Sequence, residues 1–249
     1  MCARYTLRLS SETVKHLFDL DEVFELEPRY NIAPTQDVPA ITQSREGDRK
    51  LRMLRWGLIP TWAKSAAAGA TMINARAESL KDRPAFRVPF ERRRCLLPAD
   101  GFYEWTDVAE ASEQGSLFGE PSVQKPAKTR KQPYHFTLKD EGLFAFAGLW
   151  DRWSDPSGNV VDSCCIITTV PNALLAPIHD RMPVIVPRDG YALWLDRHEK
   201  DPGELLHLLL PYPEDQMKST PVNPAVGNSR IDTPECVRAV VGERGLGAR

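Results

Sequence analysis

Proline recurs so often along this sequence that it limits the length of every helix the chain can form. The 249 residues include 21 prolines, and those at positions 60, 89, 98, 171, 183 and 187 interrupt the apolar stretches. Proline lacks a backbone donor and clashes with the preceding helical turn, which argues against long helices and regular βαβ repeats. The sequence therefore predicts an α+β fold with a few short helices around a curved antiparallel β-sheet.

Hydrophobic periodicity places the expected elements between these breaks. Alternating apolar residues predict strands at 38–42, 51–59, 136–150 and 164–170. Ser10 ahead of an apolar pattern predicts a capped amphipathic helix over 10–20, and helical periodicity returns at 189–198 and 204–210. The last 30 residues contain Pro221, Pro224, Gly227 and Pro234, and we expect an irregular tail there.

Residues 107–132 differ in composition from the rest of the chain. Ala, Ser, Glu, Gln, Gly and Lys dominate, and the segment ends in the basic run Lys125, Lys128, Arg130 and Lys131. A segment of this composition buries too little apolar surface to become ordered. We expect a flexible loop or insertion between two strands rather than a linker between domains, and a disordered tail at 241–249.

Composition also excludes several classes of protein. No run of about 18 apolar residues is present, which excludes a membrane-spanning helix, and residues 1–30 lack the pattern of a secretory signal. Five cysteines without a C-x-x-C pair fit reduced thiols, and adjacent Cys164 and Cys165 fit a core strand better than a zinc site. We expect a cytoplasmic monomer that needs no metal and no cofactor.

The net charge of −2 conceals an uneven distribution of charge. Residues 45–95 carry 13 Lys or Arg against 5 Asp or Glu, whereas the remainder carries 19 against 29. Trp56, Trp62, Phe86 and Phe90 are interleaved with the basic residues. Cations mixed with aromatic rings suit single-stranded nucleic acid, although a solvated mixed surface is the simpler alternative.

Cys2 is the residue with the most distinctive chemistry. An initiator methionine before a small side chain is normally removed, and Cys2 would then carry an α-amine and a thiol on one carbon. An α-amine has a pKa of about 7.7–8.0, so part of it is neutral and nucleophilic at cellular pH. Such a pair can form a Schiff base with an aldehyde and then close a thiazolidine ring. The alternative is a cysteine without function in a frayed terminus.

Six short motifs bear on whether Cys2 has a function. In order along the chain they are residues 1–5 (MCARY), 29–36 (RYNIAPTQ), 55–60 (RWGLIP), 74–78 (NARAE), 101–105 (GFYEW) and 178–183 (IHDRMP). Their order and content closely resemble the SRAP family of abasic-site processing proteins, which crosslink themselves to DNA. The resemblance implies a single SRAP domain over residues 1–240, with a curved, barrel-like antiparallel sheet.

The resemblance also implies a function and a set of catalytic residues. The family captures abasic sites in single-stranded DNA, whose sugar opens to an aldehyde, and Cys2 would be the nucleophile through nitrogen and then sulfur. The family's other active-site residues correspond to Asn74, Glu104 and His179. Glu104 would move protons during imine formation, His179 would act as general acid on the sugar ring oxygen, and Asn74 would orient the amine or a sugar hydroxyl.

The same correspondence indicates residues that would contact DNA. A protein bound to DNA in this way would be associated with the nucleoid. Arg4, Arg76 and Arg83 are candidates for phosphate contacts, and Trp56 and Trp62 for base stacking or for shaping the cleft. Pro34 lies in the segment that matches the family's wedge, and Thr168 matches a position near the sugar phosphate. Residues 92–94 are three arginines that could equally form a surface run.

The sequence departs from the family pattern in two places, and two other functions are compatible with the same residues. Ala3 stands where the family usually has glycine, and the 107–132 segment is long. Cys2 could instead serve an N-terminal cysteine peptidase, which we would expect to remove only the protein's own Met1. A non-covalent module that binds single-stranded DNA would also account for the basic segment.

Overall fold

The strands of this chain form two sheets in a computed structural model that describes residues 2–109, 129–198 and 202–240. The first sheet has the order β13-β8-β7-β1-β2. Its strands are β1 (Tyr5–Leu7), β2 (Arg29–Ile32), β7 (Gly101–Ala109), β8 (Thr129–Leu138) and β13 (Met217–Pro221). Every pairing within it is antiparallel.

The second sheet closes on itself. It contains β3 (Asp37–Gln43), β4 (Arg49–Trp56), β5 (Asn74–Arg76), β6 (Arg94–Ala99), β9 (Phe144–Ser154), β10 (Val160–Thr169), β11 (Met182–Pro183) and β12 (Ile185–Val186). Neighbours run in the order β10-β4-β3-β6-β9, and β9 pairs with β10 again, so five strands form a ring. The predicted α+β fold with a curved, barrel-like sheet is confirmed, although β10 pairs in parallel with β4 and β5.

The helices are short, as the prolines predict. They are α1 (Ser11–Phe18), α2 (Pro84–Arg92), α3 (Tyr191–Leu195) and α4 (Pro202–Leu206). Single turns of 3-10 helix occur at η1 (Ala66–Thr71), η2 (Ala77–Ser79), η3 (Arg188–Gly190), η4 (His207–Leu209), η5 (Glu214–Gln216), η6 (Pro224–Gly227) and η7 (Pro234–Val237). Within the described chain, no helix is long and apolar enough to cross a membrane.

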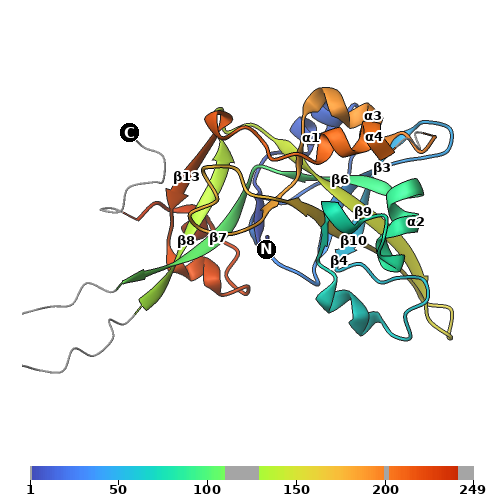
Figure 1. The fold of residues 1–249 in the computed structure, drawn as a ribbon, viewed down its shortest axis with the longest axis horizontal. Coiled ribbons are helices and arrows are strands. Elements are labelled where there is room, and N and C mark those ends of the chain that lie inside the picture. The colour runs from blue at the N-terminus through green and yellow to red at the C-terminus, as the bar shows by residue number, and fades with distance from the viewer. Residues whose placement is uncertain (1, 110–128, 199–201, 241–249) are drawn as a thin grey trace, which may run out of the picture.

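The first helix shows how a sequence pattern becomes packing. The hydroxyl of Ser10 accepts from the Thr13 amide over 3.3 Å and caps α1, as predicted. The helix buries Val14 and Phe18, and the Phe18 ring stacks on Tyr191 of α3 with centroids 5.2 Å apart. In Figure 1, α1, α3 and α4 accordingly lie together at the top of the view, while β8 and β13 lie at its left.

Two of the predicted strands have the wrong extent. The 51–59 strand ends at Trp56, because Gly57 has a φ of 137° and its amide turns to the carbonyl of Cys164 over 2.8 Å. A side chain at Gly57 would meet the backbone of Gly69 at 2.5 Å. The 136–150 strand is two strands, β8 and β9, separated by a turn in which Glu141 has a φ of 56°.

Two of the predicted irregular segments begin or end in regular structure. β7 and β8 pair as far as Ala109 and Thr129, so the ends of the 107–132 segment are strand; residues 110–128 and the predicted tail at 241–249 lie outside the described residues. The last 30 residues are not a loose tail over 220–240. They complete β13, and Val222 pairs with Ala239 while Val226 and Cys236 are buried against Tyr103.

The core fills the ring of strands and the space between the sheets. Tyr5 lies at its centre, with its ring edge-on to Trp56 and Phe146 at centroid distances of 5.3 and 5.7 Å. Cys164 and Cys165 are fully buried on β10, which confirms their prediction as core strand residues. This core fixes the start of β1, where the candidate site begins.

Candidate active site

Cys2 lies just before β1, at the point where the two sheets meet. The amide of Tyr103 on β7 donates to the carbonyl of Arg4 over 3.0 Å, and this pairing carries the start of the chain alongside Glu104. Cys2 is fully buried, and its Sγ lies 3.8 Å from the Arg4 carbonyl oxygen. Burial and the negative charge of Glu104 raise the pKa of the Cys2 thiol well above its ordinary value. The sulfur therefore stays protonated at neutral pH.

Asn74 holds Cys2 from the opposite side. It is the first residue of β5, which runs parallel to β10 with Asn74 opposite Ile166. Its Nδ2 donates to the carbonyl oxygen of Cys2 over 2.9 Å. The other amide atom, Oδ1, is buried and accepts no hydrogen bond from the described residues. An amide cannot titrate at physiological pH, so Asn74 can fix the backbone of Cys2 without changing its charge.

Glu104 is the titratable group beside Cys2. It lies on β7 opposite Tyr134 of β8, and 3% of its surface is exposed. Burial raises the pKa of Glu104 to about 7, against the attraction of the α-amino group, which favours the carboxylate. That amino group belongs to Met1 in this chain, outside the described residues. A carboxyl group with a pKa near 7 can both accept and release a proton at cellular pH.

His179 approaches from the segment between β10 and β11. Its Nδ1 accepts from the backbone amide of Arg181 over 3.0 Å and lies 2.8 Å from the carboxylate of Asp180. Burial, followed by the positive α-amino group, lowers the pKa of His179, whereas Asp180 acts in the opposite direction. The ring is therefore neutral near pH 7.

The four predicted catalytic residues thus come from four separate parts of the chain. Asn74 contacts Cys2 directly, and the charge of Glu104 acts on the Cys2 thiol. The α-amino group and Asp180 act on both Glu104 and His179. The structure therefore gathers Cys2, Asn74, Glu104 and His179 around the start of the chain, with a carboxyl group and an imidazole available for proton transfer and an amide that orients Cys2.

Two of the predicted phosphate contacts line a cavity beside this cluster. The cavity has a volume of about 270 Å³ and is lined by Thr71, Met72, Asn74, Arg76, Ser79, Arg83, Ala85 and Phe86. Arg76 ends β5, and Arg83 precedes the first turn of α2, where Pro84 begins the helix. Both arginines are exposed. Their positive charges can therefore attract an anion to the space next to Asn74.

Two other predicted contact residues are buried in this structure. Trp56 is fully buried, and its Nε1 donates to the carbonyl of Ile73 over 2.9 Å. Its ring has no exposed face for stacking here, and its part in shaping the cleft stays a prediction. Thr168 is also fully buried, and its hydroxyl donates to the carbonyl of Ala75 over 3.5 Å. Thr168 therefore has no exposed surface in this structure, and its place near a sugar phosphate stays a prediction.

Arg4 is half-buried and hydrogen-bonded within the protein. Its Nη1 donates to Asn31 Oδ1 over 2.9 Å and to the carbonyl of Val226 over 2.7 Å. These bonds tie the start of β1 to β2 and to η6 near the end of the described chain. The guanidinium of Arg4 thus has a structural role, and its phosphate contact stays a prediction.

The three arginines at 92–94 do not form a single surface run. Arg93 pairs with Asp151 on β9. Arg94 is buried and donates to the carbonyls of Trp194 and Phe90 over 2.7 and 2.6 Å. Arg92, at the end of α2, is the exposed member.

Trp62 and Pro34 remain accessible. Trp62 has 63% of its surface exposed in the segment after β4, as a stacking platform requires. Pro34 is half-buried in the turn between β2 and β3, where Thr35 has a φ of 71° and donates its amide to the carbonyl of Trp56 over 2.8 Å. The proximity of Trp62 and Pro34 to DNA stays a prediction.

Sequence reasoning missed two residues that organise the site. Glu78 and Arg181 form an ion pair between η2 and the His179 segment. Both residues belong to the motifs quoted above, at 74–78 and 178–183, yet only Asn74 and His179 received a role. The opposite charges of Glu78 and Arg181, in two motifs that share one site, could have predicted this ion pair.

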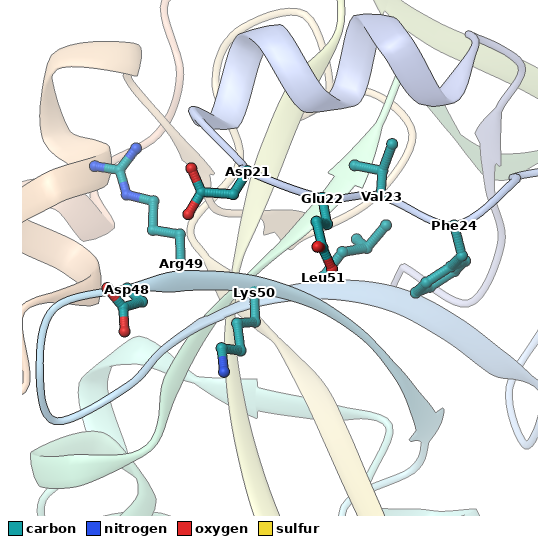
Figure 2. Close-up of a pocket in the computed structure, with 8 residues that line it drawn as sticks. All are labelled: Asp21, Glu22, Val23, Phe24, Asp48, Arg49, Lys50 and Leu51. Atoms are coloured by element: carbon teal, nitrogen blue, oxygen red, sulfur yellow. The ribbon is translucent and has the colours of Figure 1, made fainter.

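A larger cavity lies away from these residues. It has a volume of about 660 Å³ and is lined by Asp21, Glu22, Val23, Phe24, Asp48, Arg49, Lys50 and Leu51. Figure 2 shows that its walls are the segment after α1 and the start of β4. Its lining mixes both charges and contains no cysteine, histidine or amide side chain. Asn74, Arg76 and Arg83 line the smaller cavity instead.

Comparisons with known proteins find similar proteins over most of the chain. A family model described as SOS response associated peptidase (SRAP) matches residues 1–229. "Abasic site processing protein YoqW" of Bacillus subtilis (strain 168) is 39% identical over 242 residues, covering 96% of this chain and 100% of the relative. "Abasic site processing protein HMCES" of Rattus norvegicus is 31% identical over 229 residues, covering 84% of this chain and 64% of the relative. A crystal structure of a protein from Bacteroides thetaiotaomicron aligns with a TM-score of 0.77 at 27% identity, covering 96% of this chain and 100% of that one.

Proposed function

The chain belongs to the SRAP family, with curated relatives named as abasic site processing proteins, and from that premise we propose that it captures abasic sites covalently. In this proposal Met1 is removed, Cys2 becomes the first residue, and its amine and thiol together trap the aldehyde of an abasic site in single-stranded DNA. The observation that carries the proposal is the placement of Cys2, which is bonded to Asn74 and lies beside a carboxyl group with a pKa of about 7.

The reaction balances with the loss of one water. The amine nitrogen attacks C1′ of the open sugar, and a proton moves from nitrogen to the former aldehyde oxygen. The resulting hydroxyl leaves with a second proton as water, which forms the imine. Sulfur then adds to C1′ while the thiol proton passes to nitrogen, and the five-membered thiazolidine closes.

Each neighbouring side chain has a step to perform in this sequence. Glu104 accepts the proton that the amine loses and returns one to the departing hydroxyl, for which a pKa near ambient pH is the best compromise. The sugar opens when the bond between C1′ and the ring oxygen breaks: His179 gives its Nε2 proton to the ring oxygen, the C1′ hydroxyl loses its proton to water to become the aldehyde, and the imidazole regains a proton from water. Asn74 holds the Cys2 carbonyl and so fixes the direction from which the amine attacks.

The DNA would lie across the exposed arginines beside this cluster. Arg76 and Arg83 line the same cavity as Asn74. Phosphates bound there would bring the sugar to Cys2. The exposed ring of Trp62 offers a stacking surface for an unpaired base, and unpaired bases are available only in single strands. We propose that the protein acts as a monomer.

One measurement tests the chemistry and the nucleophile together. The protein is incubated with an abasic single-stranded oligonucleotide, and the intact mass is recorded. The expected product is a protein without Met1 joined to the oligonucleotide, at the sum of the two masses less one water. Cys2→Ala and an oligonucleotide with no abasic site are the controls, and neither should give an adduct. A protein that keeps Met1 and does not react would contradict the proposal.

A second candidate function follows from the peptidase in the family's description. The same amine could serve as base for the Cys2 thiol and cleave a peptide bond. We propose that such cleavage is limited to Met1. Turnover of a peptide panel without a heat-stable DNA adduct would favour a general peptidase instead. Equal, strongly salt-dependent affinity for intact and abasic strands, again without an adduct, would indicate a non-covalent binding module.

A further inference from the structure

A two-pronged ion pair connects the strand that carries Asn74 to the segment that carries His179. Arg181 donates from Nη1 and Nη2 to the two carboxylate oxygens of Glu78 over 2.7 and 2.9 Å. Glu78 lies in η2, directly after β5, and Arg181 lies two residues after His179. Two parallel N–H···O bonds fix the plane of a guanidinium as well as its position.

The protein holds Arg181 firmly at this point. Its side chain is 11% exposed, and Nη2 also donates to the carbonyl of Thr168 on β10 over 2.6 Å. The next two residues enter β11, where Met182 pairs with Thr169. Hydrogen bonding to Arg181 also lowers the pKa of Glu78, so the carboxylate stays charged at neutral pH. A buried guanidinium without its carboxylate partner is an uncompensated charge, and its desolvation cost would favour movement toward water.

The backbone of Arg181 in turn determines the tautomer of His179. Its amide donates to Nδ1 over 3.0 Å, so Nδ1 must accept and a neutral ring carries its proton on Nε2. Asp180 lies 2.8 Å from the same nitrogen, and that contact would need a proton on Nδ1. The Asp180 side chain is 84% exposed and therefore screened by water. The anchored amide is the stronger of the two competing partners.

We propose that Glu78 is a positioning residue, which holds the Arg181 amide against Nδ1 and thereby keeps the proton of His179 on Nε2. The inference rests on the proposed function, in which His179 gives a proton to the sugar ring oxygen. Glu78 itself touches neither the sugar nor Cys2 in this account. Its carboxylate acts through Arg181, from a half-exposed place outside the reacting cluster.

The test compares Glu78→Gln with Asp82→Asn, which removes one negative charge from an exposed side chain four positions away. Nitrogen NMR of the imidazole reports the tautomer, with the His179 signal assigned by its loss in His179→Gln. Single-turnover adduct formation at saturating DNA reports the chemistry. Binding to a strand with an unreactive tetrahydrofuran in place of the abasic sugar reports the affinity, and thermal unfolding reports the fold.

Glu78→Gln is expected to convert the single Nε2–H form of His179 to a mixture of tautomers. Adduct formation should slow by about tenfold, since misplacement of a catalytic group commonly costs that much, while tetrahydrofuran affinity matches that of Asp82→Asn. Arg181→Lys, which keeps the charge but loses the two-pronged geometry, should produce the same two changes.

Three outcomes separate this inference from the proposed function. An unchanged tautomer and an unchanged rate in Glu78→Gln would overturn the inference. An equally slow rate in Asp82→Asn would also overturn it, because the loss of one negative charge would then be responsible. If the wild-type protein forms no adduct, the proposed function fails, but the NMR comparison still decides whether Glu78 controls the tautomer.

Discussion

The side-chain amide of Asn74 donates a hydrogen bond to the carbonyl oxygen of Cys2 over 2.9 Å. The two residues are 72 positions apart in the chain. This bond joins β5 to the segment before β1, and it restrains the backbone of the proposed nucleophile without adding a charge.

Asn74→Ala should slow adduct formation without preventing it. A neutral hydrogen bond contributes about 1 kcal/mol, which corresponds to about a fivefold lower rate. The rate should be measured by quenched-flow gel analysis at saturating abasic DNA, so that weaker binding does not contribute. A wild-type rate in the variant would show that the orientation of the Cys2 carbonyl is unimportant.

Glu104→Gln should change how the rate depends on pH. Because burial raises the pKa of Glu104 to about 7, the basic carboxylate form becomes abundant only as the pH rises through that value. The wild-type rate should therefore increase between pH 6 and 8 with contributions from Glu104 and the α-amine. The variant should be slower and retain only the amine's contribution. Profiles of the same shape for both proteins would remove Glu104 from the proton transfers.

Arg76→Ala and Arg83→Ala should weaken binding to any single strand to a similar degree. Each variant should lower the slope of log affinity against log salt by about 0.7, the value for one phosphate contact on a single strand. Fluorescence anisotropy on intact and tetrahydrofuran-containing strands measures both quantities. Arg87, exposed on the surface of α2 and outside the cavity lining, provides the control substitution, for which a smaller change is expected.

Arg4→Ala should affect stability more than DNA affinity. The substitution removes hydrogen bonds from a charged donor to Asn31 and Val226, with an expected cost of about 2 kcal/mol in the free energy of unfolding. Urea denaturation gives that value. A stable variant with a reduced salt slope for DNA binding would favour a phosphate contact of Arg4 over a structural role.

The two tryptophans of the basic segment should behave in opposite ways. Trp62→Ala removes an exposed ring and should cost about 1–3 kcal/mol in single-strand affinity with little change in stability. Trp56→Ala removes a fully buried ring and should cost about 3–5 kcal/mol in stability. Anisotropy and thermal unfolding of both variants distinguish these roles. Trp56→Phe serves as the better-folded core substitution if the alanine variant does not accumulate.

The local features of the fold could be predicted wherever neighbouring residues carry the information. Ser10 capped its helix as expected, since the cap and its acceptor are three residues apart. The end of β4 at Gly57 was missed, because it depends on a close approach to Gly69. The C-terminal segment was interpreted as irregular from its prolines, yet Val226 and Cys236 pack against Tyr103, a contact that no local pattern contains.

The sequence by itself determined the chemical groups and the short elements: a cysteine at position 2, motifs in a characteristic order, and helices limited by proline. Tertiary structure alone decided which of the similar side chains face solvent and which titrate near pH 7. Arg4 and Arg76 look alike in sequence, but one is bonded to Asn31 and the other is exposed. Burial depends on strands brought together from distant parts of the chain, and burial also raises the pKa of Glu104.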